Sequence, residues 1–170
     1  SVPTFYNGFG HNSYWNDCEG DLPYSQLDGD DFLPEVIVGR ISVRTSNQMG
    51  VVVAKTLAYE KASYIGTTGT DWYEGAALVG DPSSSGQSTI HTNQYIENIL
   101  NNHGFEDAQT IFSGNFDGLM EDRLDEGILY INYRGYVGTS GFDVSEINSA
   151  NNGYMTPFST ILTCGTGSFV

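Results

Sequence analysis

A cysteine followed by a glycine-rich turn is the sharpest chemical signal in the sequence. Cys164 ends a run of apolar and β-branched residues, and Gly165-Thr166-Gly167 follows it directly. A thiolate in this position can attack a carbonyl carbon, and free backbone N–H groups on the glycines would stabilise the resulting oxyanion. The same pattern also fits a buried structural cysteine at a strand end, because cysteine is among the most buried residue types.

Acidic residues gather near the start of the chain, among glycine and proline turns. Ca²⁺ prefers hard oxygen ligands on adaptable loops, so this segment predicts a calcium site, although it lacks the spacing of an EF-hand. A solvated acidic surface is the alternative. The predicted metal ligands are Asp17, Glu19, Asp21, Asp28, Asp30 and Asp31.

Three histidines are candidates for a general base. His91 falls near the predicted start of a helix and is the one that could approach Cys164. A partly exposed surface histidine is the alternative at that position. His103 falls at a predicted helix end, where a positive charge suits the helix dipole, so we interpret it as structural. His11 lies in a loop that the pattern does not place.

Three arginines supply half of the positive charge of the chain: Arg40, Arg44 and Arg134. They could hold a substrate carboxylate, or they could pair with acidic side chains of the same chain. Because acidic residues greatly outnumber basic ones, we expect internal pairing.

Strands that alternate with helices must position these side chains. Such alternation indicates an α/β fold with a mainly parallel sheet flanked by helices on both faces. Sites in these folds form beyond the carboxyl ends of the strands, so we expect the loops 80–86, 133–138 and 164–167 to converge. The predicted strands are 35–40, 76–80, 109–112, 127–133 and 158–164, and the predicted helices are 47–63, 89–102 and a short one at about 116–124.

Composition excludes several classes of function. The chain has 170 residues, with 6 Lys and Arg against 21 Asp and Glu, a net charge of −15. This charge repels phosphate backbones and anionic lipid surfaces, so we expect neither nucleic acid nor a membrane surface as partner. The longest apolar runs are too short to span a bilayer. Cys18 and Cys164 could form one disulfide or remain free thiols.

The organisation of the chain follows from the same patterns. Residues 1–34 form an acidic, aromatic-rich loop region, and residues 35–170 form the α/β domain. The sequence lacks an initiator Met and ends directly after a predicted buried strand, so we expect an excerpt from a longer protein. A composition with few lysines and many Tyr, Gly, Asn and Ser is typical of an extracellular or cell-surface protein.

Four segments together resemble a known family. They are Asp-Leu-Pro-Tyr-Ser-Gln-Leu-Asp-Gly-Asp-Asp at 21–31, Leu-Pro-Glu-Val-Ile-Val-Gly-Arg-Ile-Ser at 33–42, Asn-Tyr-Arg-Gly at 132–135 and Leu-Thr-Cys-Gly at 162–165. In order and spacing the sequence resembles the catalytic domain of the gingipains, which are secreted cysteine endopeptidases with a caspase-like α/β fold. The resemblance implies a peptidase that acts on proteins or peptides, and it supports the expectation of Ca²⁺.

The resemblance also assigns roles to individual residues. It makes Cys164 the nucleophile, with Gly165 beside it, and it places Gly135 just before the position of the family's catalytic histidine. Tyr136 occupies that position here. Asp81 is the nearest match to the acidic residue that orients the histidine. Thr89 falls where arginine-specific members carry an acidic residue that binds a basic side chain, so specificity for arginine is not implied.

The substitution of the histidine leaves three functions open. A phenol is a poor base at neutral pH, and a cysteine without an imidazole partner is mostly thiol. The chain is therefore an active cysteine peptidase with another base, a catalytically silent family member that binds partners, or a structural subunit that assembles through its sheet edge and aromatic surface.

Overall fold

The computed structural model describes residues 21–29, 31 and 33–166, and these fall into two units. The first unit contains residues up to Ser46, and its described part has one short 3-10 helix, η1 (Leu22–Tyr24). The second unit, residues 47–166, contains the sheet. The two units are described separately.

The strand predicted over residues 35–40 is wrong. The backbone there is irregular, and the side chains of Val36, Ile37 and Val38 are exposed. A strand needs a neighbouring strand to pair with its backbone groups, and no described strand pairs with this segment. A run of β-branched residues therefore did not suffice to specify a strand.

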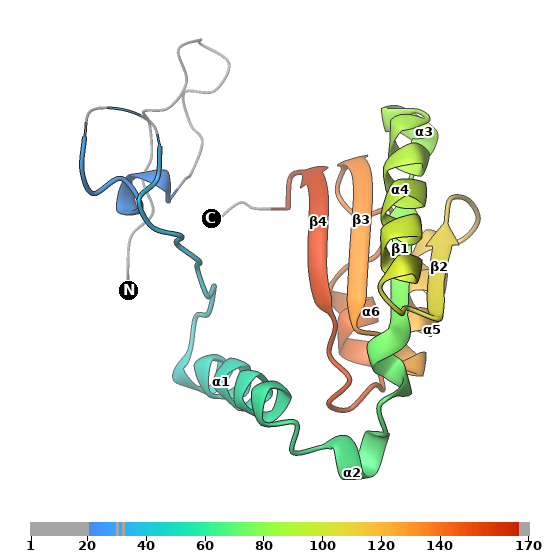
Figure 1. Cartoon of the computed structure of the whole chain (residues 1–170), viewed down its shortest axis with the longest axis horizontal. Helices are drawn as coiled ribbons and strands as arrows, with labels where there is room; N and C mark the ends of the chain where they lie inside the picture. Colours follow the sequence, from blue (N-terminus) through green and yellow to red (C-terminus); the bar gives the residue numbers. More distant parts are fainter. Residues whose placement is uncertain (1–20, 30, 32, 167–170) are drawn as a thin grey trace. The chain divides into compact units, whose positions relative to one another are not determined.

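The second unit is built on four parallel strands in the order β2-β1-β3-β4 (Figure 1). Every residue of β1 is buried, as expected for a central strand covered on both faces. The edge strand β4 is mostly exposed. The bounds are β1 (Gly75–Gly80), β2 (Asp107–Ile111), β3 (Tyr130–Val137) and β4 (Phe158–Cys164).

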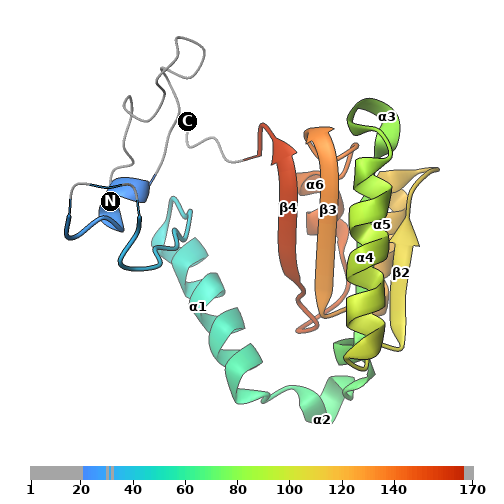
Figure 2. The ribbon, with the colours of Figure 1, turned by 45° about the horizontal axis from the view of Figure 1, so that its top comes forward.

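Helices lie on both faces of this sheet, as the sequence predicted. Figures 1 and 2 show α4 on one face and α5 with α6 on the other. The first strand is preceded by α1, which contributes no buried residue, then by α2 and η2. The bounds are α1 (Ser46–Lys61), α2 (Ile65–Thr68), η2 (Asp71–Glu74), α3 (Pro82–Ser85), α4 (Ser88–Asn102), α5 (Phe116–Glu126) and α6 (Val144–Ser149).

The main hydrophobic core lies between the sheet and α5. Its strand residues alternate along the chain, because successive side chains of a strand point to opposite faces. Met120 and Leu124 of α5 complete the core one helical turn apart. The other members are Ala77, Val79, Ile111, Ile128, Ile131 and Tyr133.

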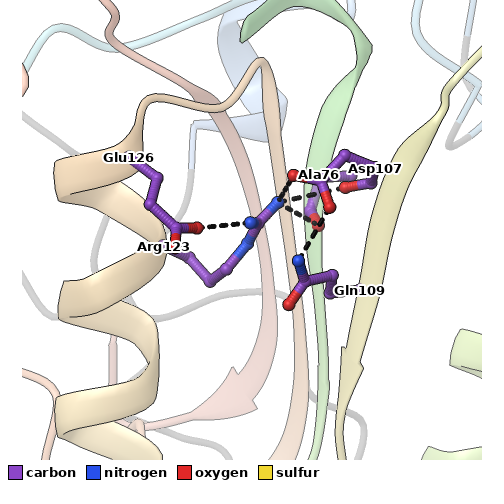
Figure 3. A network of polar contacts seen from close by, with 5 residues as sticks. All are labelled: Ala76, Asp107, Gln109, Arg123 and Glu126. Carbon is purple, nitrogen blue, oxygen red and sulfur yellow. Dashed lines mark hydrogen bonds and ion pairs between the residues drawn. The ribbon is translucent and has the colours of Figure 1, made fainter.

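A buried arginine fixes α5 to the amino ends of the strands (Figure 3). Arg123 is only 5% exposed, and its guanidinium donates to the carboxylate of Asp107 at 2.6 Å and to the carbonyl of Asp107 at 3.0 Å. It also donates to Glu126 on its own helix and to the carbonyl of Ala76. Gln109 donates to the second oxygen of Asp107 at 2.7 Å. This network stabilises the end of the sheet opposite Cys164.

Candidate functional site

The three loops that the sequence expected to converge do meet at one edge of the sheet. The backbone N–H of Asp81, after β1, donates to the carbonyl of Arg134 on β3 at 3.1 Å. The N–H of Gly138, after β3, donates to the carbonyl of Cys164 on β4 at 2.9 Å. Because β1, β3 and β4 are adjacent and parallel, their carboxyl ends form one continuous edge.

The candidate nucleophile lies exposed at the end of the edge strand. Among the described residues, Cys164 is a free thiol, and it pairs in register with Val137 of β3. Its exposure removes the alternative of a cysteine buried in the core. The register between β3 and β4 shifts between Arg134 and Val137, so β3 bulges next to the thiol. Bulges occur often beside active sites, where they redirect a side chain.

Tyr136 lies within this bulged segment and is 61% exposed. Its position confirms that Tyr136 and Cys164 occupy neighbouring carboxyl ends of one parallel sheet. Within the described part of the chain, no hydrogen bond of the Tyr136 hydroxyl is found. The phenol of Tyr136 is therefore exposed near the strand end that carries Cys164.

Each oxygen of the Asp81 carboxylate accepts a hydrogen bond from a serine. One oxygen accepts from the backbone N–H of Ser83 at 2.9 Å, which caps α3. The other accepts a short hydrogen bond from the hydroxyl of Ser140. Partial burial acts to raise the pKa of Asp81, but the hydrogen bonds from Ser140 and Ser83 outweigh it and hold the pKa below its usual value. Asp81 is therefore ionised and accepts hydrogen bonds within the loops at this edge of the sheet.

A buried tyrosine completes this network beneath Gly135. The hydroxyl of Tyr133 lies 2.7 Å from that of Ser140. Because Ser140 gives its single proton to Asp81, Tyr133 is the donor in this contact. A Cβ atom at Gly135 would lie 2.5 Å from the Tyr133 hydroxyl oxygen, so only glycine fits there. Burial raises the pKa of Tyr133, which keeps the phenol protonated.

Gly165 follows the candidate nucleophile with a φ of +82°, in the left-handed region that favours glycine. A Cβ there would make an ordinary contact with Val137, at 3.7 Å. The glycine is therefore required by its backbone angle. Gly167, the second glycine of the predicted oxyanion loop, lies outside the described residues.

A buried amide pair behind the site was not predicted from the sequence. The amide of Asn132 on β3 donates to the Asn93 side-chain oxygen on α4 at 2.8 Å. Asn93 in turn donates to the carbonyls of Val79 and Thr89, each at 2.9 Å. Both asparagines are almost completely buried. The available signal was Asn132, a polar residue within the apolar run that ends in β3.

Thr89 is also fully buried, and its hydroxyl bonds to the carbonyl of Gly86. The backbone there packs closely against β1, since a Cβ at Gly80 would lie 2.8 Å from the Thr89 carbonyl oxygen. Thr89 therefore contributes to the packing of α4 against the sheet.

The histidines do not complete a catalytic pair within the described residues. His91 is exposed on α4, and no hydrogen bond joins it to Cys164. His103 is the C-cap of α4, which confirms its placement at a helix end. His11 and Cys18 lie outside the described residues.

The arginines behave differently from one another. Arg40 forms a two-pronged ion pair with Asp21, with N–O distances of 2.6 and 2.7 Å, which confirms internal pairing for this residue. Arg134 instead donates to the carbonyls of Gly135 and Leu162, at 2.9 and 3.4 Å. The prediction of an acidic partner is therefore wrong for Arg134 within the described part of the chain. Its guanidinium stabilises the bulged end of β3.

The described carboxylates of the acidic segment make contacts within the chain. Asp21 is neutralised by Arg40, while Asp28 and Asp31 accept from the backbone N–H groups of Gly29 and Leu33. In the described ranges, no three side chains of His, Cys, Asp or Glu are grouped as metal ligands. The other predicted ligands, Asp17, Glu19 and Asp30, lie outside those ranges.

Comparison with known proteins decides the family. The whole chain, residues 1–170, matches the model of the family described as Peptidase family C25. The chain belongs to peptidase family C25. Gingipain R2 and gingipain R1 of Porphyromonas gingivalis are each 27% identical over 163 residues, which is 89% of this chain. The aligned part covers only 22% and 16% of those relatives.

Solved structures confirm the caspase-like α/β fold of this C25 chain. The crystal structure of the Arg-specific cysteine proteinase gingipain R superposes with a TM-score of 0.74 at 25% identity. The match covers 88% of this chain and 36% of the gingipain chain. A complex of the gingipain pro- and mature domains from Porphyromonas gingivalis gives the same TM-score over 86% of this chain. No helix in the described part is long and apolar enough to cross a membrane.

Proposed function

We propose that this chain is part of a secreted, gingipain-type member of family C25 that retains the nucleophilic cysteine but not the histidine base. On this proposal Cys164 marks the peptide-binding edge of the sheet, and peptide hydrolysis is slow or absent. The domain then acts by binding proteins or peptides outside the cell. The observation that carries the proposal is Tyr136, at the position where the family resemblance expects histidine.

The surroundings of the cysteine support this proposal. Without an imidazole the thiol has no partner to remove its proton, and a phenol does not replace it near neutral pH. The nearest match to the family's orienting acid, Asp81, gives both carboxylate oxygens to Ser83 and Ser140. The site is thus internally satisfied without a histidine.

Peptide hydrolysis by the unmodified chain tests the proposal. We expect turnover of peptide substrates near background and slow labelling of Cys164 by a thiol-reactive peptidyl probe. The double substitution Tyr136→His with Val137→Gly should raise turnover by roughly 10²–10⁴-fold, the usual contribution of a positioned acid–base group. Val137 is included because it pairs directly with Cys164, so its branched side chain lies beside the thiol.

The control is Cys164→Ala in both backgrounds. Efficient hydrolysis by the unmodified chain, lost in Cys164→Ala, would overturn the proposal. The variant His91→Ala would then show whether that exposed histidine supplies the base.

Self-assembly is a second candidate function, favoured by the exposed edge strand. β4 forms the edge of the sheet, and Phe158, Ile161 and Leu162 expose apolar side chains along it. Exposed edges of this kind readily pair with another strand. Sedimentation of the full chain over a range of concentrations tests it: reversible association that Ile161→Lys abolishes supports assembly, and a monomer at all concentrations contradicts it.

Calcium binding by the acidic segment 17–31 stays a prediction. Six carboxylates within fifteen residues repel one another unless cations neutralise them. Of the carboxylates that the structure describes, Asp21 is the one that Arg40 neutralises. We expect millimolar Ca²⁺ to raise the melting temperature, with Mg²⁺ as the control. An unchanged melting temperature would contradict the prediction.

A further inference from the structure

The loop that follows β3 is tied to the site at several points. At one end, the N–H of Gly138 donates to the carbonyl of Cys164 at 2.9 Å. At the other end, the hydroxyl of Ser140 donates to Asp81 and accepts from Tyr133. The backbone N–H of Asp81 also donates to the carbonyl of Arg134 on β3, at 3.1 Å. These contacts link the ends of β1, β3 and β4.

The backbone at Ser140 shows that this arrangement is specific. Its φ is +52°, in the left-handed region that residues with a side chain rarely adopt. Among the described residues, only Ala62 and Ser140 have a positive φ without being glycine. Unfavourable backbone conformations persist where surrounding contacts determine them, and here the contacts are the two hydrogen bonds of the Ser140 hydroxyl.

We propose that Asp81 is a positioning residue that acts through Ser140. Its carboxylate ties loop 135–140 to the end of β1, and this contact fixes the part of the loop that bonds to Cys164 and thereby limits how reagents approach the exposed thiol. The role differs from that implied by the family resemblance, in which the acid orients a histidine. The inference rests on the proposed function only in taking Cys164 as the reactive group of the site.

Burial and charge explain why the contact holds. Asp81 is partly buried and ionised, so its hydrogen bond from Ser140 is of the strong, charge-assisted kind. Tyr133 donates to the same serine from the buried side and leaves no room for a side chain at Gly135. Releasing Ser140 therefore frees the loop between Gly135 and Ser140, and with it the Gly138 N–H that bonds to Cys164.

Two site-resolved measurements on the full chain test the inference. The first is hydrogen exchange of the Gly138 amide, and the second is the rate at which iodoacetamide alkylates Cys164, followed on the Cys164-containing peptide by mass spectrometry. In Ser140→Ala we expect exchange at Gly138 to accelerate by roughly 10- to 100-fold, the factor for losing one hydrogen bond to a charged group. Alkylation of Cys164 should accelerate in parallel.

Two further substitutions at Ser140 separate the hydrogen bond from the backbone angle. Ser140→Gly removes the hydroxyl but relieves the left-handed strain, so it should loosen the loop as Ser140→Ala does. Ser140→Asn tolerates this backbone region and offers an amide donor to Asp81, so it should restore slow exchange. If Ser140→Gly matches the unmodified chain, the backbone angle alone positions the loop and the proposal is wrong.

The matched control is Ser149→Ala. Ser149 of α6 makes the same kind of short hydrogen bond to a carboxylate, that of Glu121 on α5, away from Cys164. Ser149→Ala should leave both rates unchanged.

Asp81→Asn is a second test variant, for the case that Ser140→Ala does not fold. The asparagine keeps an acceptor for Ser83 but loses the charge, so it should also accelerate both rates. Unchanged rates in both Ser140→Ala and Asp81→Asn would overturn the inference, whatever the hydrolytic activity of the chain. Efficient peptide hydrolysis by the unmodified chain, together with accelerated exchange in these variants, would refute only the proposed function.

Discussion

The buried amide pair between α4 and the sheet should be a principal source of stability. The substitution Asn93→Ala removes the donor to the carbonyls of Val79 and Thr89 and the acceptor for the Asn132 amide. Asn132 is only 1% exposed, so water cannot replace the lost partner. The contact also joins positions 39 residues apart in the chain.

The cost of Asn93→Ala can be worked out from these contacts. Leaving one buried polar group without a partner costs about 1–3 kcal/mol, and the stranded amide of Asn132 is the main such group. The small cavity left by the side chain adds to this cost. We therefore expect the free energy of unfolding to fall by about 2–4 kcal/mol, or the melting temperature by roughly 5–15 °C for a chain of this size.

Urea unfolding followed by circular dichroism measures this loss. Asn98→Ala is the matched control, because Asn98 lies on the same helix but its side chain is exposed and bonds only to the carbonyl of Gln94. It should change stability by less than about 0.5 kcal/mol. A double-mutant cycle with Asn132→Ala should show strong coupling, since the two side chains share one hydrogen bond. Equal effects of Asn93→Ala and Asn98→Ala would refute this account of the core.

Three further perturbations follow from the same structure. Arg123→Met should lower the free energy of unfolding by about 1–3 kcal/mol in urea titrations, because the carbonyl of Asp107 loses a buried donor. Burial acts to raise the pKa of Asp107, but hydrogen bonds from Gln109 and Arg123 hold the pKa below its usual value. The ionised carboxylate therefore stabilises the fold above the unfolded pKa, and this stabilisation is lost as pH falls through the folded pKa. Asp107→Asn should consequently make the free energy of unfolding less dependent on pH below about pH 4. Gly135→Ala should lower the melting temperature, because its Cβ would meet the Tyr133 hydroxyl, whereas Gly66→Ala meets nothing within 4 Å and should not.

Much of the α/β unit could be predicted from local patterns. The strand predicted over 158–164 has those bounds, and the helix predicted over 89–102 differs from α4 by one residue. These segments carry strong local signals: a run of apolar and β-branched residues in one, and helical spacing ended by His103-Gly104 in the other. The convergence of the three loops then followed from the parallel order of the strands.

The predictions that failed concern features that depend on contacts between residues far apart in the chain. Residues 35–40 have the composition of a strand, but no described strand pairs with them. Arg134 bonds to the carbonyl of Gly135 in the bulged part of β3 and to that of Leu162 on β4, and a bulge cannot be predicted from composition. The bond between Asp81 and Ser140 spans 59 positions of the chain, so no local pattern announces it.

The carboxylate of Asp81, at the carboxyl edge of the sheet, is stabilised by hydrogen bonds from residues of the same chain. A partly buried carboxylate is costly unless hydrogen bonds or charges compensate it. At Asp81 the compensation comes from Ser83 and Ser140, and Tyr133 supports Ser140 from below. Residues of the same chain therefore stabilise the ionised Asp81 carboxylate, and this stabilisation does not depend on the side chain at position 136.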